Sequence, residues 1–98
     1  MPSPDAPQIL LALQLANGYG AQPGAWRMPG TDPSAYTDMD VLVRYAQTAE
    51  RGKIQLIFLA DTPVLDVDLE QQAPHHATDP IVVLTSMARS TERIGLVA

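Results

Sequence analysis

Apolar residues gather in three short runs along the chain, at residues 8–15, 54–60 and 94–98. Short apolar runs that are bounded by turn residues such as glycine, asparagine, aspartate or proline are typical of buried strands. The run at 54–60 is apolar on both faces apart from Gln55, as expected of a strand that is covered on both sides. The pattern therefore predicts three strands.

The two segments between these runs carry the spacing of amphipathic helices. The first helix has two candidate N-caps, Asp32 before Pro33 and Thr37 three residues before Asp40, and we favour Thr37 for the main helix. Gly52 is expected to end this helix, because a left-handed C-terminal residue is best accommodated without a Cβ. An apolar stripe at steps of three and four is predicted along it: Met39, Leu42, Val43, Ala46 and Ala49.

The second helix is predicted to begin after Asp79, a good N-cap, with Pro80 at the first helical position. Its inward stripe is expected to consist of four residues: Ile81, Leu84, Ala88 and Thr91. Strands that alternate with helices in this way predict an α/β fold with parallel pairing and right-handed crossovers.

The connecting loops differ in length according to the element that they follow. Each helix is joined to the next strand by a very short turn, such as Gly52–Lys53. The segments after the first two strands are far longer than the usual length of about two to six residues. Long loops after strands place the functional face at the carboxyl ends of the strands. Barrels and doubly wound sheets are both built this way, so loop length alone does not choose between them.

Composition narrows the classes of function. The chain has 98 residues, of which 46% are hydrophobic and 17% charged, and this fits one folded domain at most. A net charge of -5 with only 6 Lys and Arg argues against a nucleic-acid partner. The lack of cysteine excludes disulfides and thiolate metal sites and fits a cytoplasmic protein. The apolar run at 9–16 follows no basic residue and is too short to span a bilayer, so we expect no membrane segment.

Few side chains stand out as candidates for chemistry. Asp61 stands at the carboxyl end of the second strand, either as a turn-forming residue or as a carboxylate directed into a pocket, and the residues leave both interpretations open. Trp26 and Arg27 in the first long loop are substrate-pocket candidates, since an Arg beside a Trp can hold an anionic substrate. Packing of the loop over the sheet is the favoured interpretation for this pair.

Two other motifs are weak evidence for a binding site. Gly18, Gly20 and Gly24 lack the G-x-G-x-x-G spacing and are not followed at once by a helix, which disfavours a dinucleotide site. His75 and His76 are adjacent, so their side chains diverge, and we expect no metal site. A catalytic triad or a phosphate loop is not recognisable either.

Three segments taken together resemble one family: 23–29 (PGAWRMP), 46–61 (AQTAERGKIQLIFLAD) and 79–96. This family comprises the flavin-dependent monooxygenases typified by nitrilotriacetate monooxygenase component A and dibenzothiophene sulfone monooxygenase, within the bacterial-luciferase-like superfamily. The combination of A-E-R-G-K with F-L-A-D is specific to this group, and the resemblance extends over residues 8–98 in order. Gln55 stands where the family commonly has Asp.

The resemblance implies a (β/α)8 TIM barrel and a two-component reaction. A separate flavin reductase supplies reduced FMN, and the monooxygenase uses it with O2 to oxygenate a small organic substrate. Residues 1–98 then form a single partial domain, the N-terminal β-α-β-α-β portion with the first three strands and two helices of an incomplete barrel. Asp61 matches the aspartate that contacts the flavin in this family. The later flavin contacts of the family are not in this sequence, so the isolated chain is expected to be inactive.

The alternative interpretation is a non-enzymatic α/β module that self-associates through its open strand edges. A homo-oligomer is compatible with either interpretation. A small flavodoxin-like domain is a third, and it is weakened by the lack of a phosphate loop after the first strand.

Overall fold

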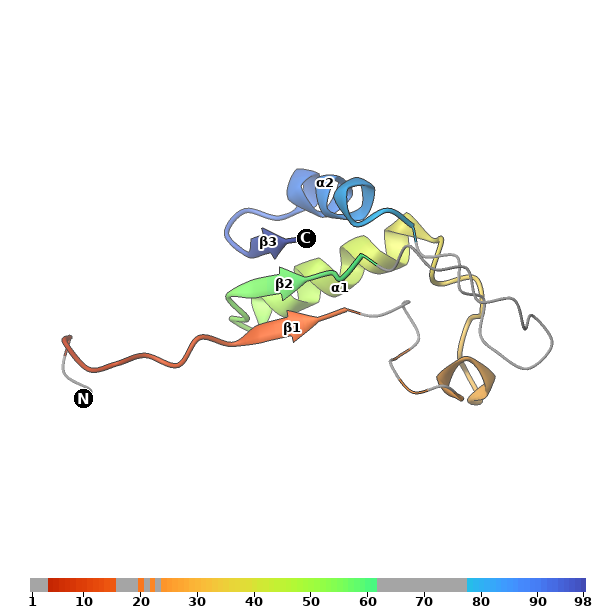
Figure 1. Cartoon of the computed structure of the whole chain (residues 1–98), viewed down its shortest axis with the longest axis horizontal. Coiled ribbons are helices and arrows are strands. Elements are labelled where there is room, and N and C mark those ends of the chain that lie inside the picture. The colour runs from red at the N-terminus through yellow and green to blue at the C-terminus, as the bar shows by residue number, and fades with distance from the viewer. Residues whose placement is uncertain (1–3, 16–19, 21, 23, 62–77) are drawn as a thin grey trace.

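The structure is a computed structural model that describes residues 4–15, 20, 22, 24–61 and 78–98. Three strands form one parallel sheet in the order β1-β2-β3 (Figure 1). The elements follow in the order β1 (Ala12–Gln14), the 3-10 turn η1 (Ala25–Arg27), α1 (Met39–Arg51), β2 (Leu56–Phe58), α2 (Pro80–Ser90) and β3 (Gly95–Val97). The predicted alternation of strands and helices and the parallel pairing are confirmed. The prediction of a buried strand at 8–15 is wrong in its first half, because β1 covers only Ala12–Gln14 and Ile9, Leu10 and Leu11 are 82%, 61% and 50% exposed.

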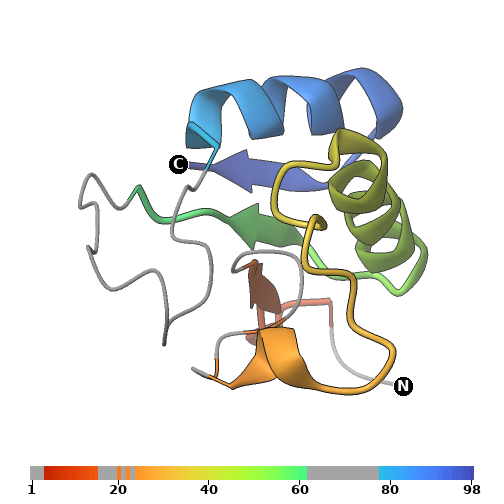
Figure 2. The same ribbon diagram turned by 90° about the vertical axis from the view of Figure 1, so that its right-hand side faces the viewer.

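Both helices lie on the same face of the sheet (Figures 1 and 2). The register pairs Leu13 with Ile57 and Ile57 with Leu96, and these three side chains share the helix-covered face. A doubly wound sheet carries helices on both faces, whereas a barrel keeps all of its crossover helices outside. Right-handed crossovers between consecutive strands put their helices on one face both in a barrel and in each half of a doubly wound sheet, so this arrangement agrees with the barrel that the resemblance implies.

The prediction that residues 54–60 are covered on both faces is wrong for the described structure. Ile57 is 0% exposed and Leu59 8%, but Phe58 between them is 36% exposed. Successive side chains of a strand point to opposite faces, and both described helices pack on the Ile57 face. The other face of β2 is therefore apolar, but no described element covers it.

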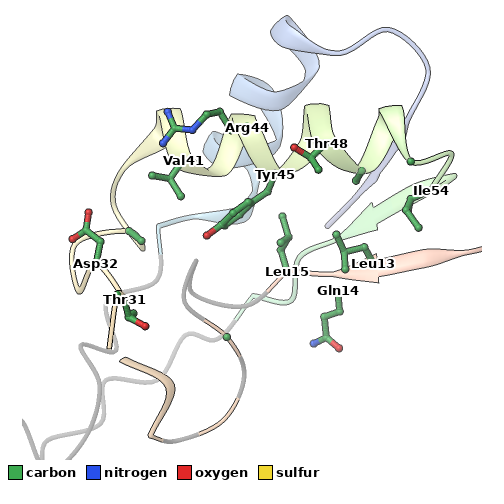
Figure 3. Close-up of a pocket in the computed structure, with 15 residues that line it drawn as sticks. Leu13, Gln14, Leu15, Thr31, Asp32, Val41, Arg44, Tyr45, Thr48 and Ile54 are labelled. Carbon is green, nitrogen blue, oxygen red and sulfur yellow. The ribbon is translucent and has the colours of Figure 1, made fainter. Parts of the chain in front are cut away.

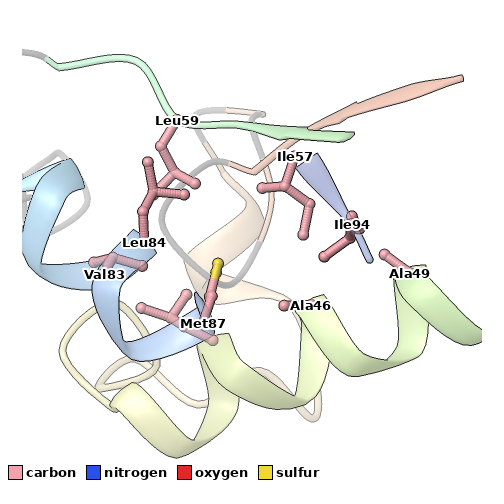
Figure 4. Packing of buried hydrophobic residues seen from close by; sticks show 9 residues of the cluster. Ala46, Ala49, Ile57, Leu59, Val83, Leu84, Met87 and Ile94 are labelled. Carbon is pink, nitrogen blue, oxygen red and sulfur yellow. The ribbon is translucent and has the colours of Figure 1, made fainter. Parts of the chain in front are cut away.

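The core lies between the sheet and the two helices (Figure 4). Ile57 of β2, Met87 of α2 and Ala46 of α1 are all fully buried. The small side chains of Ala46 and Ala49 let the backbone of α1 lie close to the strands, and the larger side chains of α2 fill the remaining space. Burial of each Ile- or Met-sized side chain contributes about 1.5–3 kcal/mol.

The N-cap of α1 is Asp38, so the prediction of Thr37 is wrong by one residue. Asp38 has extended backbone angles, and its carboxylate accepts hydrogen bonds from the backbone N–H groups of Asp40 at 3.0 Å and Val41 at 3.4 Å. The hydroxyl of Thr37 donates instead to the backbone oxygen of Ser34 at 3.1 Å. A threonine that is engaged in the preceding turn is not available to the helix N-terminus.

The C-terminus of α1 also differs from its prediction. The left-handed residue is Lys53, with φ 65°, whereas Gly52 has an ordinary φ of -77°. The N–H of Lys53 donates to the Glu50 carbonyl at 3.1 Å, and the N–H of Ile54 donates to the Ala49 carbonyl at 3.0 Å. These two bonds form a Schellman motif, whose left-handed position is usually glycine. The glycine in the sequence predicted the correct turn but the wrong residue within it.

The start of α2 is as predicted, but of its predicted inward stripe only Leu84 is buried. The Asp79 carboxylate accepts from the N–H of Ile81 at 2.8 Å, and Pro80 occupies the first turn. Ile81 is 63% exposed, Ala88 is exposed, and Thr91 is half-buried. The buried residues of α2 are Pro80, Val83, Leu84 and Met87. Because apolar residues surround much of α2, its sequence allows more than one inward stripe, and contact with the sheet selects this one.

Two side chains join the elements at the amino-terminal edge of the sheet. The Glu50 carboxylate accepts hydrogen bonds from three successive backbone N–H groups, those of Glu92 at 2.9 Å, Arg93 at 2.7 Å and Ile94 at 3.0 Å. These bonds fix the turn between α2 and β3 to the end of α1. The Gln55 side-chain oxygen accepts from the N–H of Leu11 at 2.8 Å and ties the start of β1 to β2.

Candidate functional site

The carboxyl edge of the sheet is the end at which the long loops leave the strands. Leu59 extends β2 beyond its regular part, because its N–H donates to the Val97 carbonyl at 2.9 Å. Asp61 follows two residues later and is exposed. The structure therefore puts this carboxylate at the edge where barrel enzymes hold their active-site residues.

The residues that lead into α1 and α2 are joined at this end of the sheet. The hydroxyl of Thr78, just before α2, donates to the backbone oxygen of Tyr36, just before α1, at 3.4 Å. The Asp32 carboxylate organises the loop before α1, since it accepts both the N–H and the hydroxyl of Ser34 at 2.9 and 2.7 Å. These bonds lower the pKa of Asp32 below its ordinary value and keep it charged as the acceptor of that turn.

Trp26 and Arg27 lie together in η1. The guanidinium of Arg27 is 4.6 Å from the centroid of the Trp26 ring, a cation–π contact. Trp26 is half-buried and Arg27 exposed. The backbone N–H of Arg27 donates to the Gly24 carbonyl, and the hydroxyl of Thr31 donates to the Ala25 carbonyl, so η1 is a locally closed turn. Among the described residues, no contact joins this pair to Asp61.

Other motifs of the sequence are less informative. Gly20 has φ 117°, and a Cβ there would lie 3.3 Å from the Cβ of Ala25, which gives this glycine a conformational and packing role. Gly18, His75 and His76 lie outside the described residues. In the described part of the chain, no three His, Cys, Asp or Glu side chains come together as a metal-binding group would require. Over the same residues, none of the helices has the length and apolar character needed to cross a membrane.

A groove that the sequence analysis missed runs between α1 and β1 (Figure 3). Its volume is 970 Å³, and it extends from the loop around Asp32 to Ile54. Neither Asp61 nor the Trp26–Arg27 pair lines it. The signal that would have revealed it is a second stripe on α1, formed by Val41, Tyr45, Thr48 and Gly52.

Comparison with known proteins supports the family resemblance. The chain is 37% identical over 93 residues to N-acetyl-S-(2-succino)cysteine monooxygenase of Bacillus subtilis (strain 168), and the match covers 93% of this chain. It is 34% identical over 89 residues, 80% of the chain, to nitrilotriacetate monooxygenase component A of Aminobacter aminovorans. It is 33% identical over 86 residues, 84% of the chain, to one of the subunits of pristinamycin IIA synthase of Streptomyces pristinaespiralis. The homologues of this chain are luciferase-like flavin monooxygenases.

The match is limited to one part of each luciferase-like relative. The chain spans 20% of the length of each of these three proteins. No family model matches the chain. The β-α-β-α-β order, with both helices on one face, agrees with a portion of the barrel of these monooxygenases.

The A-E-R-G-K segment at 49–53, which contributes to the likeness with these monooxygenases, has a structural role in this chain. Glu50 binds the turn that leads into β3, and Lys53 is the left-handed residue that ends α1. Both act at the amino-terminal edge, where barrel residues serve stability rather than chemistry. Asp61, at the end of F-L-A-D, lies at the opposite edge.

Proposed function

We propose that residues 1–98 form the first three strands and two helices of an FMN-dependent monooxygenase barrel, as a single partial domain. The observation that carries this proposal is the 37% identity to a monooxygenase over 93% of the chain. The sheet agrees with it, since all described crossover helices lie on one face and the long loops leave from the carboxyl edge. In this proposal a separate flavin reductase supplies reduced FMN, and the substrate is a small organic molecule.

Among the described residues, one polar side chain at the carboxyl edge is suited to bind a flavin. Asp61 is an exposed carboxylate at the carboxyl edge, and a carboxylate accepts hydrogen bonds from the N–H groups of a flavin ring. When bound, reduced FMN supplies the electrons that activate oxygen. The role of Asp61 would be to bind and orient the ring. The uncovered apolar face beside it, which includes Phe58, would help to exclude water.

Trp26 and Arg27 are proposed to form part of the wall of the substrate pocket. Stacking of Arg27 on Trp26 holds the guanidinium at a defined place in η1 while leaving its N–H groups able to bind an anion. A neutral substrate would use mainly the ring of Trp26.

The test is a chimera in which this chain replaces the matching fifth of the Bacillus subtilis monooxygenase. Substitution Asp61→Ala is expected to weaken FMN binding about 10- to 100-fold, because a hydrogen bond to a charged group is worth about 1.5–3 kcal/mol. Asp40→Ala, an exposed carboxylate on α1, is the control and should leave FMN affinity unchanged. Equal FMN affinity of the Asp61→Ala and control chimeras would contradict the assignment of Asp61.

The isolated chain provides a second test of the same proposal. Without the other flavin contacts it is expected to bind FMN weakly and to show no oxygenation with reduced FMN. Turnover by the 98-residue polypeptide alone would show that it is not a part of a larger active site.

A self-associating module remains the second candidate, because the sheet exposes apolar side chains on its uncovered face. Phe58 is 36% exposed and Val97 42%. Size-exclusion chromatography with amide exchange distinguishes the two proposals. A single oligomer with protected strand amides supports the module, whereas aggregation or fast exchange throughout supports the partial barrel.

A further inference from the structure

One polar side chain on the uncovered face of the sheet has no part in the contacts proposed above. We propose that the side-chain amide of Gln14 in β1 is a second flavin contact, which donates a hydrogen bond to a carbonyl oxygen of the ring while Asp61 accepts one from a ring N–H. This inference rests on the proposed function, because it requires FMN to bind at the carboxyl edge of the sheet.

The first observation is the direction of the Gln14 side chain. Figure 3 shows Leu13 and Leu15 directed toward α1, whereas Gln14 is directed to the opposite side of β1. Successive side chains of a strand alternate between the two faces, and Leu13 and Leu15 pack against the core under the helices. Gln14 therefore belongs to the face of the sheet that no described helix covers.

The second observation is the chemistry of this uncovered face. The register sets Gln14 opposite Phe58 and Phe58 opposite Val97, so that their side chains form one row across the sheet. An amide in an apolar row needs a hydrogen-bond partner once the face is covered, because a buried polar group without one is destabilising. Gln14 is the polar residue among the strand residues that the structure describes on this face, and the others are all apolar: Ala12, Leu56, Phe58, Gly95 and Val97.

The third observation is the position of Gln14 along β1. The next residue, Leu15, donates its backbone N–H to the Phe58 carbonyl at 3.1 Å, which is the last bond between β1 and β2 in the described part of the chain. Gln14 is thus next to the carboxyl end of β1. Phe58, its partner on β2, precedes Asp61 by three residues, which is about 10 Å of extended chain. A flavin ring that contacts Asp61 is therefore within reach of the long side chain of Gln14.

The hydrogen-bonding pattern of the flavin calls for a donor as well as an acceptor. On the pyrimidine side of the ring, an N–H lies between two carbonyl groups. An ionised carboxylate only accepts hydrogen bonds, so Asp61 can pair with the N–H but not with the oxygens beside it. The amide of Gln14 offers two N–H donors without adding a charge, and within the described residues its side chain has no other hydrogen-bond partner.

FMN binding by the chimera with the Bacillus subtilis monooxygenase tests the proposal. Gln14→Leu removes the donor, and it should weaken FMN binding about 3- to 10-fold, the effect of losing one hydrogen bond between neutral groups. The infrared bands of the ring carbonyls of bound FMN should move to higher wavenumber, because a hydrogen bond weakens the C=O bond. Gln14→Glu should weaken binding further, since an ionised carboxylate has no N–H to donate to a carbonyl oxygen.

The matched control is Gln8→Leu, the same substitution at an exposed residue at the start of the same apolar run. At about 3.3 Å per residue, Gln8 lies about 20 Å along the chain from Gln14, so the control should leave FMN affinity and the carbonyl bands unchanged. Urea unfolding separates a ligand contact from a structural role. Because the row around Gln14 is apolar, Gln14→Leu should not lower the urea midpoint of the FMN-free chimera.

The outcomes that contradict the Gln14 contact differ from those that contradict the proposed function. Equal FMN affinity of the Gln14→Leu and Gln8→Leu chimeras, unshifted carbonyl bands, or a Gln14→Leu chimera that fails to fold would each overturn the contact. A higher KM for the substrate at constant FMN affinity would also overturn it and would place the amide against the substrate. Weaker FMN binding by Asp61→Ala with no effect of Gln14→Leu retains the proposed function and rejects this inference, whereas a folded chimera that binds no FMN rejects both.

Discussion

Two residues of the turn after α1 show how single positions shape this fold. Lys53 adopts a left-handed backbone conformation with φ 65°, which costs a residue with a Cβ about 1–2 kcal/mol. The Schellman hydrogen bonds of the turn and the packing of Ile54 against the core hold it in place. Glu50, in the last turn of the same helix, binds the start of β3. The C-terminal end of α1 is therefore joined to the sheet by the packing of Ile54 and by the hydrogen bonds of Glu50.

Lys53→Gly is expected to stabilise the chain by up to about 1 kcal/mol, since glycine accepts positive φ without strain. Gly52→Ala is the matched comparison, because Gly52 has φ -77° and tolerates a Cβ about as well as any exposed position. Urea unfolding followed by circular dichroism measures both. A strongly destabilising Gly52→Ala together with a neutral Lys53→Gly would mean that Gly52 is the left-handed residue.

Glu50 makes stability depend on pH. Backbone hydrogen bonds from Arg93, Ile94 and Glu92 favour its carboxylate form and lower its pKa in the folded state from the ordinary value of 4.5. The unfolded chain therefore binds the proton more readily, so the stabilisation is complete above pH 4.5 and is lost as pH falls through the lowered pKa.

Glu50→Gln should destabilise the chain at neutral pH and weaken this acid dependence. Thermal unfolding of both proteins at a series of pH values between neutrality and strong acid measures the difference. The two unfolding temperatures are expected to converge as the pH falls. A difference that stays constant across the range would show that the charge of Glu50 is not what binds the α2–β3 turn.

At the scale of elements, the helices begin where a carboxylate accepts backbone N–H groups, and α1 ends where the turn holds a left-handed residue. Asp38 and Asp79 act in the same way at α1 and α2. The face that each helix buries is set by what it packs against. α1 turns one stripe to the sheet and presents a second to the groove, whereas α2 buries Val83 and Met87 and leaves Ile81 exposed.

The cap of α1 gives a direct test of this account. Asp38→Ala should destabilise the chain by about 1 kcal/mol, because two backbone N–H groups lose their acceptor. Thr37→Ala is expected to cost less, since its hydroxyl serves only the preceding turn. Urea unfolding of the two variants decides between the caps, and a larger loss for Thr37→Ala would restore Thr37 as the functional cap.

At the scale of the whole molecule, one face of the sheet is covered by the two helices, and no described element covers the other. On the helix-covered face, Ile57 of β2 is fully buried against residues such as Met87 of α2. On the opposite face, Phe58 and Val97 remain partly exposed. In a complete barrel this second face lies inside and is filled by side chains from the other strands. The asymmetry makes the effect of a mutation depend on whether the rest of the barrel is present.

Ile57→Ala is expected to cost about 2–5 kcal/mol in the isolated chain, because it opens a cavity between the sheet and both helices. Phe58→Ala, its neighbour on the uncovered face, should cost much less there. In the chimera with the Bacillus subtilis monooxygenase, the cost of Phe58→Ala should rise toward that of Ile57→Ala. Unfolding measurements on the four proteins test this, and an unchanged cost for Phe58→Ala would place that residue outside any barrel interior.

Local patterns in the sequence are enough to predict the α/β class, the parallel order of elements, the start of α2 and, apart from Val43, the stripe of α1. Each of these depends on local periodicity or on cap chemistry, which the chain carries in consecutive residues. The position of Asp61 at the carboxyl edge also followed, because it depends only on where a strand ends.

The remaining features depend on contacts between segments that are far apart in the sequence. The choice among the possible stripes of α2, and between Gly52 and Lys53 in the left-handed position, depended on contacts with the sheet that no local pattern contains. The covering of one face of the sheet by both helices also depends on the direction of the crossovers, which no local pattern contains. The groove along α1 likewise exists only between segments far apart in sequence, because Val41 and Leu13 meet across it through the fold and not through their spacing.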